Sequence, residues 1–348
     1  MSSLTQCGRV KSVDIARGIA IICIILGHFG LDRVNHFVFT FHVPIFYLIT
    51  GYFISDRTSV WDFTKKRLRT LIVPYYITCI AIVSAAYLMN ELLLHWGDSR
   101  EIAIGWIKAS LYGAGDSYST PFPIKGIGAI WFLWATFWAS LFLRMSLSLK
   151  PLPRLAFVLA LFAVGFWTRK QFFWFPLSIQ AGCCATLFLY FGYLCRQILP
   201  CYRELPPEFK TAWSVSALAV WVCFIRNFKS FWLVHCDIGR GIIDIFGSLC
   251  ACFCILQFSD WLDQHGPRPV VSLFSFLGEY SIFTLCAHMV ELDVVPWYVL
   301  QDMLYAVGLS PYFNIVIVLL CKMIWAIIIT VVFANWNVTR RLAGLPPK

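Results

Sequence analysis

Long apolar runs, divided by short polar or basic segments, follow one another along the whole chain. A helix needs about 20 mainly apolar residues to cross a bilayer, and ten runs approach that length, the fifth being the shortest. The predicted spans are 12–31, 36–56, 70–93, 128–149, 155–168, 178–199, 211–227, 241–262, 271–294 and 313–337. The pattern therefore predicts an all-α, polytopic transmembrane helix bundle of about ten spans, formed by a single domain over residues 1–348.

The segment between about 94 and 127 interrupts this pattern. It is rich in Gly, Pro, Ser and Asp, which favour turns and loops, and it is too polar to span a membrane. We predict that it forms the largest loop on the outer side.

The composition agrees with a membrane protein. Hydrophobic residues make up 59% of the chain and charged residues 13%, which is more apolar than an average soluble domain. The net charge of +10 comes mainly from Lys and Arg beside the apolar runs, where they set the orientation of the spans. We therefore expect both termini in the cytoplasm and no nucleic-acid partner.

The cysteines do not indicate a metal site. Most of the 14 cysteines lie inside apolar runs, where Cys packs as a small hydrophobic residue. The sequence has neither paired Cys-x-x-Cys motifs nor a Cys/His set with zinc spacing. We expect no metal.

Two ionisable residues interrupt the first apolar run. Arg17 and His28 lie on one stripe of the predicted helix, about 16 Å apart along its axis. Each costs at least ~2.5 kcal/mol near the middle of a bilayer, so such residues usually face a cavity and mark function. Asp32, four residues after His28, is predicted to hold the imidazole as a general base requires. Asp14 lies three residues before Arg17 and is an ordinary neutralising partner for it.

Three histidines are predicted to share one layer of the bundle. The orientation of the spans places His28, His42 and His288 at a similar depth in the outer third of the hydrocarbon core. For His42 and His288 a packing role, with the ring hydrogen-bonded between helices, remains an alternative.

Two further features have both a structural and a functional interpretation. Lys65, Lys66, Arg67 and Arg69 precede the third span, where they either anchor the loop in the cytoplasm or bind phosphate groups of an anionic ligand. Trp131 begins the fourth span near the outer surface, where it is either an interface anchor or a surface on which a sugar ring stacks.

Five segments along the chain carry the candidate residues in a fixed order. They are Val13 to Ala20 with Gly27-His28, Phe41 to Tyr47 with Thr50 to Phe53, Lys66 to Arg69 with Pro74-Tyr75, Ile130 to Leu133, and Leu277 to Ser281 with His288. Together these segments resemble the motifs of the acyltransferase 3 family of integral membrane acyltransferases, and within it the fucose 4-O-acetylase-like branch. Thr50 stands where the family usually has Ser, and Lys66 replaces a commoner Arg.

The resemblance implies a membrane O-acyltransferase that moves an acyl group, usually acetyl, from coenzyme A to a hydroxyl of a cell-envelope glycan. The implied location is the bacterial cytoplasmic membrane, and the implied partners are a glycan or lipid-linked saccharide acceptor and membrane lipid. The expected donor is acetyl-coenzyme A, with its phosphates at the four cations before the third span and its arm passing Arg17. The thioester then reaches His28, the expected general base.

The remaining candidates are expected on the acceptor side. His42 would orient the acceptor or stabilise the oxyanion, and Trp131 and His288 would line the glycan site. Two alternatives remain from the residues alone. A secondary transporter also carries ionisable residues near the midplane, although the sequence shows no internal repeat. A non-catalytic membrane partner would leave the histidine layer unexplained.

Overall fold

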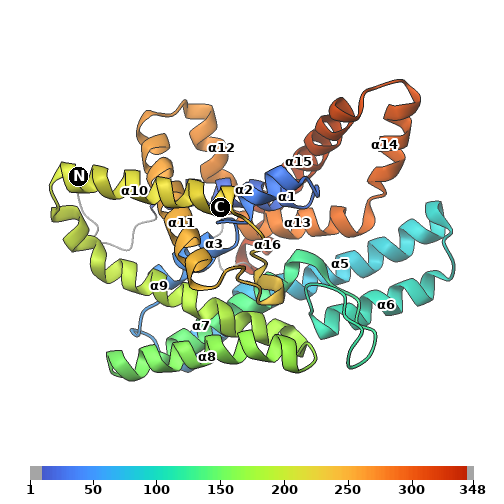
Figure 1. Cartoon of the computed structure of the whole chain (residues 1–348). Coiled ribbons are helices and arrows are strands. Elements are labelled where there is room, and N and C mark those ends of the chain that lie inside the picture. The colour runs from blue at the N-terminus through green and yellow to red at the C-terminus, as the bar shows by residue number, and fades with distance from the viewer. Residues whose placement is uncertain (1–9, 343–348) are drawn as a thin grey trace.

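A computed structural model describes residues 10–342 as a bundle of helices (Figure 1). The chain is 80% helical, and no strand occurs within the described residues, which confirms the predicted all-α bundle. The helices are α1 (Lys11–Gly27), α2 (Asp32–Val38), α3 (Pro44–Phe53), α4 (Val60–Arg67), α5 (Val73–Met89), α6 (Ser99–Tyr112), α7 (Trp131–Ser146), α8 (Pro151–Gln171), α9 (Ile179–Glu204), α10 (Pro207–Arg226), α11 (Ile242–His265), α12 (Arg268–Glu279), α13 (Ser281–Val294), α14 (Trp297–Ala306), α15 (Pro311–Asn335) and α16 (Asn337–Leu342).

Short irregular turns of helix join some of these elements. Two π-helical segments, Leu68–Ile72 and Asn90–Leu94, flank α5 and make one continuous helical rod from α4 onward. Three 3₁₀ turns, Gly128–Ile130, Pro176–Ser178 and Leu233–His235, lie in the loops before α7, α9 and α11.

The number of spans differs from the ten that the sequence predicts. Seven helices of the described chain are long and apolar enough to cross a membrane, or eight if α12 and α13, bent by 79°, count as one span. The difference lies in the first two predicted spans. α1 ends at Gly27, and the second apolar run is divided into α2 and a ten-residue α3. The two chain ends lie outside the described residues, so their side of the membrane stays a prediction.

Backbone conformation explains why the first two runs are broken. Gly30 has a φ of +68°, which an L-residue in a helix cannot adopt. Pro44 opens α3 at its first position, where the missing N–H does no harm. The segment between these two breaks carries His42, and the first break places His28 at a helix end rather than inside a helix.

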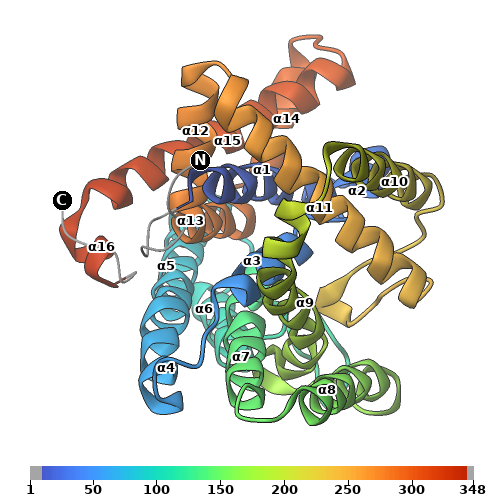
Figure 2. The same ribbon diagram turned by 90° about the vertical axis from the view of Figure 1, so that its left-hand side faces the viewer.

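Helix α1 lies near the centre of the bundle (Figure 2) and contacts α2, α3, α11, α12, α13 and α15. Glycines allow the closest approaches. A Cβ atom on Gly18 of α1 would lie 2.0 Å from the carbonyl oxygen of Phe274 in α12, and one on Gly278 of α12 would lie 1.7 Å from that of Asp14. Small residues at such crossings bring backbones into contact and drive packing within membranes.

A second glycine crossing joins α3 to α9. A Cβ on Gly51 would lie 1.8 Å from the carbonyl oxygen of Leu189, and one on Gly192 would lie 1.9 Å from that of Leu48. Both crossings involve the helices that flank the histidines, so they fix the position of these helices tightly.

Long loops gather at the end of the bundle where α1 ends. The Ser178 hydroxyl donates to the carbonyl of Gly113 at 2.7 Å, and the N–H of Ile127 donates to Ala114 at 2.8 Å. The predicted 94–127 loop therefore packs against the α8–α9 loop, although its first part forms α6. At the opposite end, Arg340 of α16 donates to Ala334, and Arg69 donates to the carbonyl of Arg341 at 2.7 Å.

Candidate functional site

His28 stands at the C-terminal end of α1, directly after the last helical residue. Its side chain is exposed, whereas the side chains before it on α1 are largely buried. The ring Nδ1 atom lies 2.8 Å from the carbonyl oxygen of Ile24 and 3.3 Å from the Nε2 atom of His288. The two imidazole rings meet edge to face, with their centres 5.1 Å apart.

His288 belongs to a buried polar network on α13. Its Nδ1 atom lies 2.7 Å from a carboxylate oxygen of Glu291, and both side chains are completely buried. The other oxygen of Glu291 accepts a hydrogen bond from the Trp297 indole and lies 3.7 Å from the ammonium group of Lys322 on α15. Charges buried within a membrane protein require such partners.

These contacts define the protonation of both rings. The carboxylate of Glu291 accepts only, so Nδ1 of His288 carries the proton and its Nε2 has a lone pair. The Nδ1–H of His28 then donates to Ile24 and His288 together. The Nε2 atom of His28 is left unprotonated, on an exposed ring, which is the arrangement that a general base needs.

His42 lies in the turn between α2 and α3 and is buried. Its Nδ1 atom donates to the carbonyl oxygen of Val38 at 2.6 Å, and the ring edge contacts Phe39. His42 interacts electrostatically with His28, so the two imidazoles lie in one region of the bundle. With its proton on Nδ1, neutral His42 presents Nε2 as an acceptor.

The basic residues before α5 have different surroundings. Arg67 interacts electrostatically with Arg17, and its guanidinium lies over the ring of Phe63. Lys65 and Lys66 are exposed, and the ammonium group of Lys65 lies 4.9 Å from the centre of the Trp61 ring. Two arginines of like charge, Arg17 and Arg67, thus come together at the end of α1 that lies away from His28. Arg17 also pairs with Asp14 at 3.7 Å.

Comparison with known proteins decides the family. The sequence model of the acyltransferase 3 family, described as an acyltransferase domain, matches residues 10–335. The chain belongs to this family. No curated protein and no solved structure matches it. Since the match covers nearly the whole chain, the described helices form a membrane acyltransferase domain.

The candidate site differs from the sequence prediction in three residues. Asp32 is exposed at the start of α2, and the turn after Gly27 removes the helical spacing that would have joined it to His28. His288 is completely buried behind His28 and so does not line a glycan site. Trp131 is also buried and packs beneath Gly115, so its ring offers no open face to a sugar.

Two residues of the buried network behind His28, Glu291 and Lys322, were not among the candidates from the sequence. Lys322 is the only charged residue in the apolar sequence of α15, which is a sign of function in a membrane helix. Glu291 follows His288 at the i+3 spacing that brings side chains together on a helix. Both signals were present in the sequence, but only the packing of α13 against α15 joins them.

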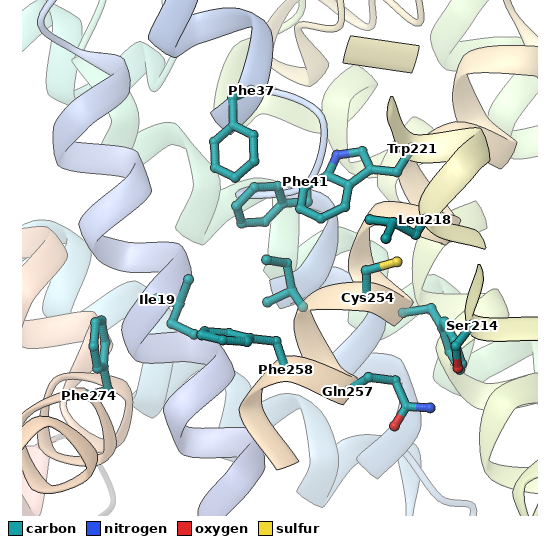
Figure 3. A pocket seen from close by; sticks show the side chains of 12 residues that line it. Ile19, Phe37, Phe41, Ser214, Leu218, Trp221, Cys254, Gln257, Phe258 and Phe274 are labelled. Atoms are coloured by element: carbon teal, nitrogen blue, oxygen red, sulfur yellow. The ribbon is translucent and has the colours of Figure 1, made fainter. Parts of the chain in front are cut away.

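The acyltransferase domain also contains an apolar cavity of about 520 Å³ between α1, α10 and α11. Figure 3 shows Phe37, Phe41 and Trp221 grouped at one end of this cavity, with Ile19 and Phe258 farther along it. No histidine or charged residue lines it. It therefore offers no histidine or carboxylate for proton transfer.

Proposed function

We propose that the protein transfers an acetyl group from acetyl-coenzyme A to a hydroxyl group of a cell-envelope glycan in the bacterial cytoplasmic membrane. Membership of the acyltransferase 3 family supports acyl transfer. One observation carries the mechanism, namely the contact chain from Glu291 through His288 to His28. It orients an exposed imidazole whose free nitrogen faces away from the buried network.

His28 acts as the general base in this proposal. Its Nε2 atom removes the proton from the acceptor hydroxyl while the oxygen attacks the thioester carbonyl carbon. The new C–O bond forms, the C–S bond breaks, and the proton passes from His28 to the departing thiolate. Glu291 stabilises the positive charge that develops on the histidine pair, because its carboxylate hydrogen-bonds to His288.

His42 orients the acceptor in this proposal. The sequence left two roles open for it, an acceptor contact or an oxyanion contact. The 2.6 Å hydrogen bond from Nδ1 to Val38 favours the first role, since neutral His42 then has no proton on Nε2 to give to an oxyanion. An acceptor hydroxyl can donate to this nitrogen and be turned toward the thioester.

The donor is proposed to enter from the end of the bundle that carries Arg17 and Arg67. Two adjacent guanidinium groups suit the phosphates of coenzyme A, and the exposed Lys65 and Lys66 add positive charge beside them. Helix geometry separates Arg17 from His28 by about 16 Å, a distance of the order of the pantetheine arm. Arg69 is given a structural role instead, because its guanidinium donates a hydrogen bond to the backbone carbonyl of Arg341.

A transfer assay tests this function. The purified full-length protein is incubated with labelled acetyl-coenzyme A and a glycan from which O-acetyl groups have been removed by mild base. We expect the label and the mass of one acetyl group on the glycan, with no transfer by His28→Ala. Absence of transfer by the wild type to every glycan offered, with no thioester hydrolysis either, would contradict the proposal.

A further inference from the structure

A second pocket, which is polar and has a volume of about 310 Å³, lies among the loops at the end of the bundle that carries His28. Its wall contains Tyr118 from the loop before α7, Arg169 and Trp174 from the end of α8 and the loop after it, and His235 and Asp237 from the loop before α11. Small-molecule sites begin at about 300 Å³. This volume suits one small ring and is too small for a whole coenzyme A.

The charged groups of the pocket are already paired with one another. The Tyr118 hydroxyl donates to His235 Nδ1 at 3.0 Å, and His235 Nε2 lies 3.1 Å from a carboxylate oxygen of Asp116. Arg169 lies 3.4 Å from Asp237. His235 and Arg169 thus each have a carboxylate beside them. A neutral ligand with several hydroxyl groups suits this arrangement better than an anion does.

Asp237 stays ionised in this pairing. Burial opposes its charge, but hydrogen bonds from Ser230 and from the N–H of Gly239, together with the charge of Arg169, hold the pKa of Asp237 below its ordinary value. The carboxylate accepts hydrogen bonds from neighbouring hydroxyls, and the guanidinium group beside it donates hydrogen bonds to them.

Two donors in the wall of the pocket have no acceptor within the described part of the chain. They are the indole Nε1 of Trp174, whose side chain is 4% exposed, and the Nε of Arg169. Buried donors without a partner are rare and costly in native proteins. Both donor atoms are buried beneath the surface of the pocket, so a ligand that accepts hydrogen bonds removes that cost only if these side chains turn toward it.

Aromatic rings connect the pocket to the candidate reaction site. The ring of His235 stacks on Trp232 at 5.6 Å, Trp232 stacks on Phe39 at 5.6 Å, and Phe39 contacts His42 at 4.8 Å. The side chain of Trp232 is 42% exposed. Trp232 stacks on both His235 and Phe39, so its exposed part borders a continuous row of rings that leads from the pocket to His42.

From this pocket and path we infer a second acceptor subsite, which binds a neutral sugar unit of the glycan at a distance from the hydroxyl that receives the acetyl group. This inference rests on the proposed function for the identity of the acceptor. A chain of sugars seated in the pocket runs along Trp232 and Phe39 and brings its reacting hydroxyl to His42 and His28. The protein would then select a chain rather than a free monosaccharide.

A binding experiment without acetyl-coenzyme A tests the subsite separately from the reaction. Saturation-transfer NMR is recorded on the purified full-length protein with methyl glucoside, methyl galactoside and methyl fucoside, and with glucuronate as the charged probe. We expect signals for at least one neutral glycoside. They should weaken about tenfold in Arg169→Gln and in His235→Ala, the loss of roughly one hydrogen bond to a charged group.

Three controls make this experiment decisive. Lys229→Ala removes an exposed cation that does not line the pocket, and it should leave the signals unchanged. His28→Ala should abolish transfer while glycoside binding persists. Tyr118→Phe removes only the hydroxyl, so a weaker signal in this folded variant locates the ligand in the pocket. No signal with any neutral glycoside, preference for glucuronate, or equal signals in all variants would overturn the inference.

Kinetics distinguish a second subsite from the reaction site. We expect Arg169→Gln and His235→Ala to raise KM for a glycan chain several-fold, with unchanged KM for acetyl-coenzyme A and for a monosaccharide acceptor. An equal rise of KM for the monosaccharide would place the pocket at the reacting hydroxyl and contradict a separate subsite. An active enzyme with no change in any KM would also overturn it.

Discussion

The Nε2 atom of His288 lies 3.3 Å from the Nδ1 atom of His28, although the two residues are 260 positions apart in sequence. This contact places the exposed histidine at the end of α1 in front of the buried pair on α13. His28 is thereby held by fully buried groups, and in the proposed mechanism only its Nε2 atom meets the substrate. A reactive ring on a rigid, buried support is what positioned acid–base catalysis needs.

Replacing the proposed base should remove the chemistry and leave the fold. His28→Ala deletes an exposed ring, so we expect normal insertion and thermal stability with transfer reduced by about 10²- to 10⁴-fold. The measurement is initial rate with saturating donor and acceptor. Activity above about one tenth of the wild type would contradict the assignment of His28 as the general base.

The variant Glu291→Gln should show whether Glu291 positions the two histidines or binds substrate. The variant loses the carboxylate that fixes His288, so we expect kcat to fall about 10- to 100-fold, with KM for acetyl-coenzyme A unchanged. Glu208→Gln, on the exposed start of α10, is the matched control and should behave as the wild type. A rise in KM with unchanged kcat would place Glu291 in substrate binding instead.

Lys322 should stabilise the folded protein, because its ammonium group compensates the buried carboxylate of Glu291. Lys322→Met leaves the buried charge of Glu291 without its cation, which costs about 3–5 kcal/mol when one partner of a buried pair is removed. The double variant Glu291→Gln with Lys322→Met should regain much of that stability but not the activity. The check is thermal unfolding in detergent; additive losses of stability in the double variant would disprove the coupling.

Arg17→Gln and Arg67→Gln should weaken donor binding. We expect KM for acetyl-coenzyme A to rise several-fold in each, and salt to raise the wild-type KM as well, because exposed phosphate pairing is screened. Arg69→Gln should chiefly loosen α16, since Arg69 donates to the backbone of Arg341. Calorimetric binding of acetyl-coenzyme A that is equal in wild type and Arg17→Gln/Arg67→Gln would refute the proposed donor entry.

The glycine crossing between α3 and α9 gives a prediction on stability. A Cβ on Gly51 would lie 1.8 Å from a backbone oxygen, so Gly51→Ala must push the helices apart and should cost about 1–3 kcal/mol. Gly105→Ala is the control, because nothing lies within 4 Å of its Cβ position in α6. Equal melting temperatures for the two variants would show that this close packing is not important.

The fold class could be predicted from sequence because the period and length of apolar runs report directly on membrane helices. What the sequence did not reveal is where those runs are interrupted. The run of 12–31 continues in composition past Gly27, but the turn at Gly30 ends the helix. The same turn made the predicted contact of Asp32 with His28 wrong, since a spacing of four residues aligns side chains only within a continuous helix.

The candidate site could also be predicted only in part, because the sequence identifies unusual residues but not the contacts between them. Arg17, His28 and His288 are unusual residues within apolar sequence, and such residues can be recognised without a structure. The order in which they contact one another depends on packing. Nothing local distinguishes a histidine that faces substrate from one that stands behind another, so His288 was placed on the glycan side although it is fully buried.

The pairing of Lys322 with Glu291 also constrains how this protein is made. Each of the two side chains lies on a helix of its own, and each alone is costly in lipid. During synthesis α13 leaves the ribosome before Lys322 does, so Glu291 has its hydrogen-bond partners but lacks its cation until α15 follows. We expect α13, α14 and α15 to enter the membrane as one hairpin-like unit, with the last long helix of the described chain completing a site that begins on the first.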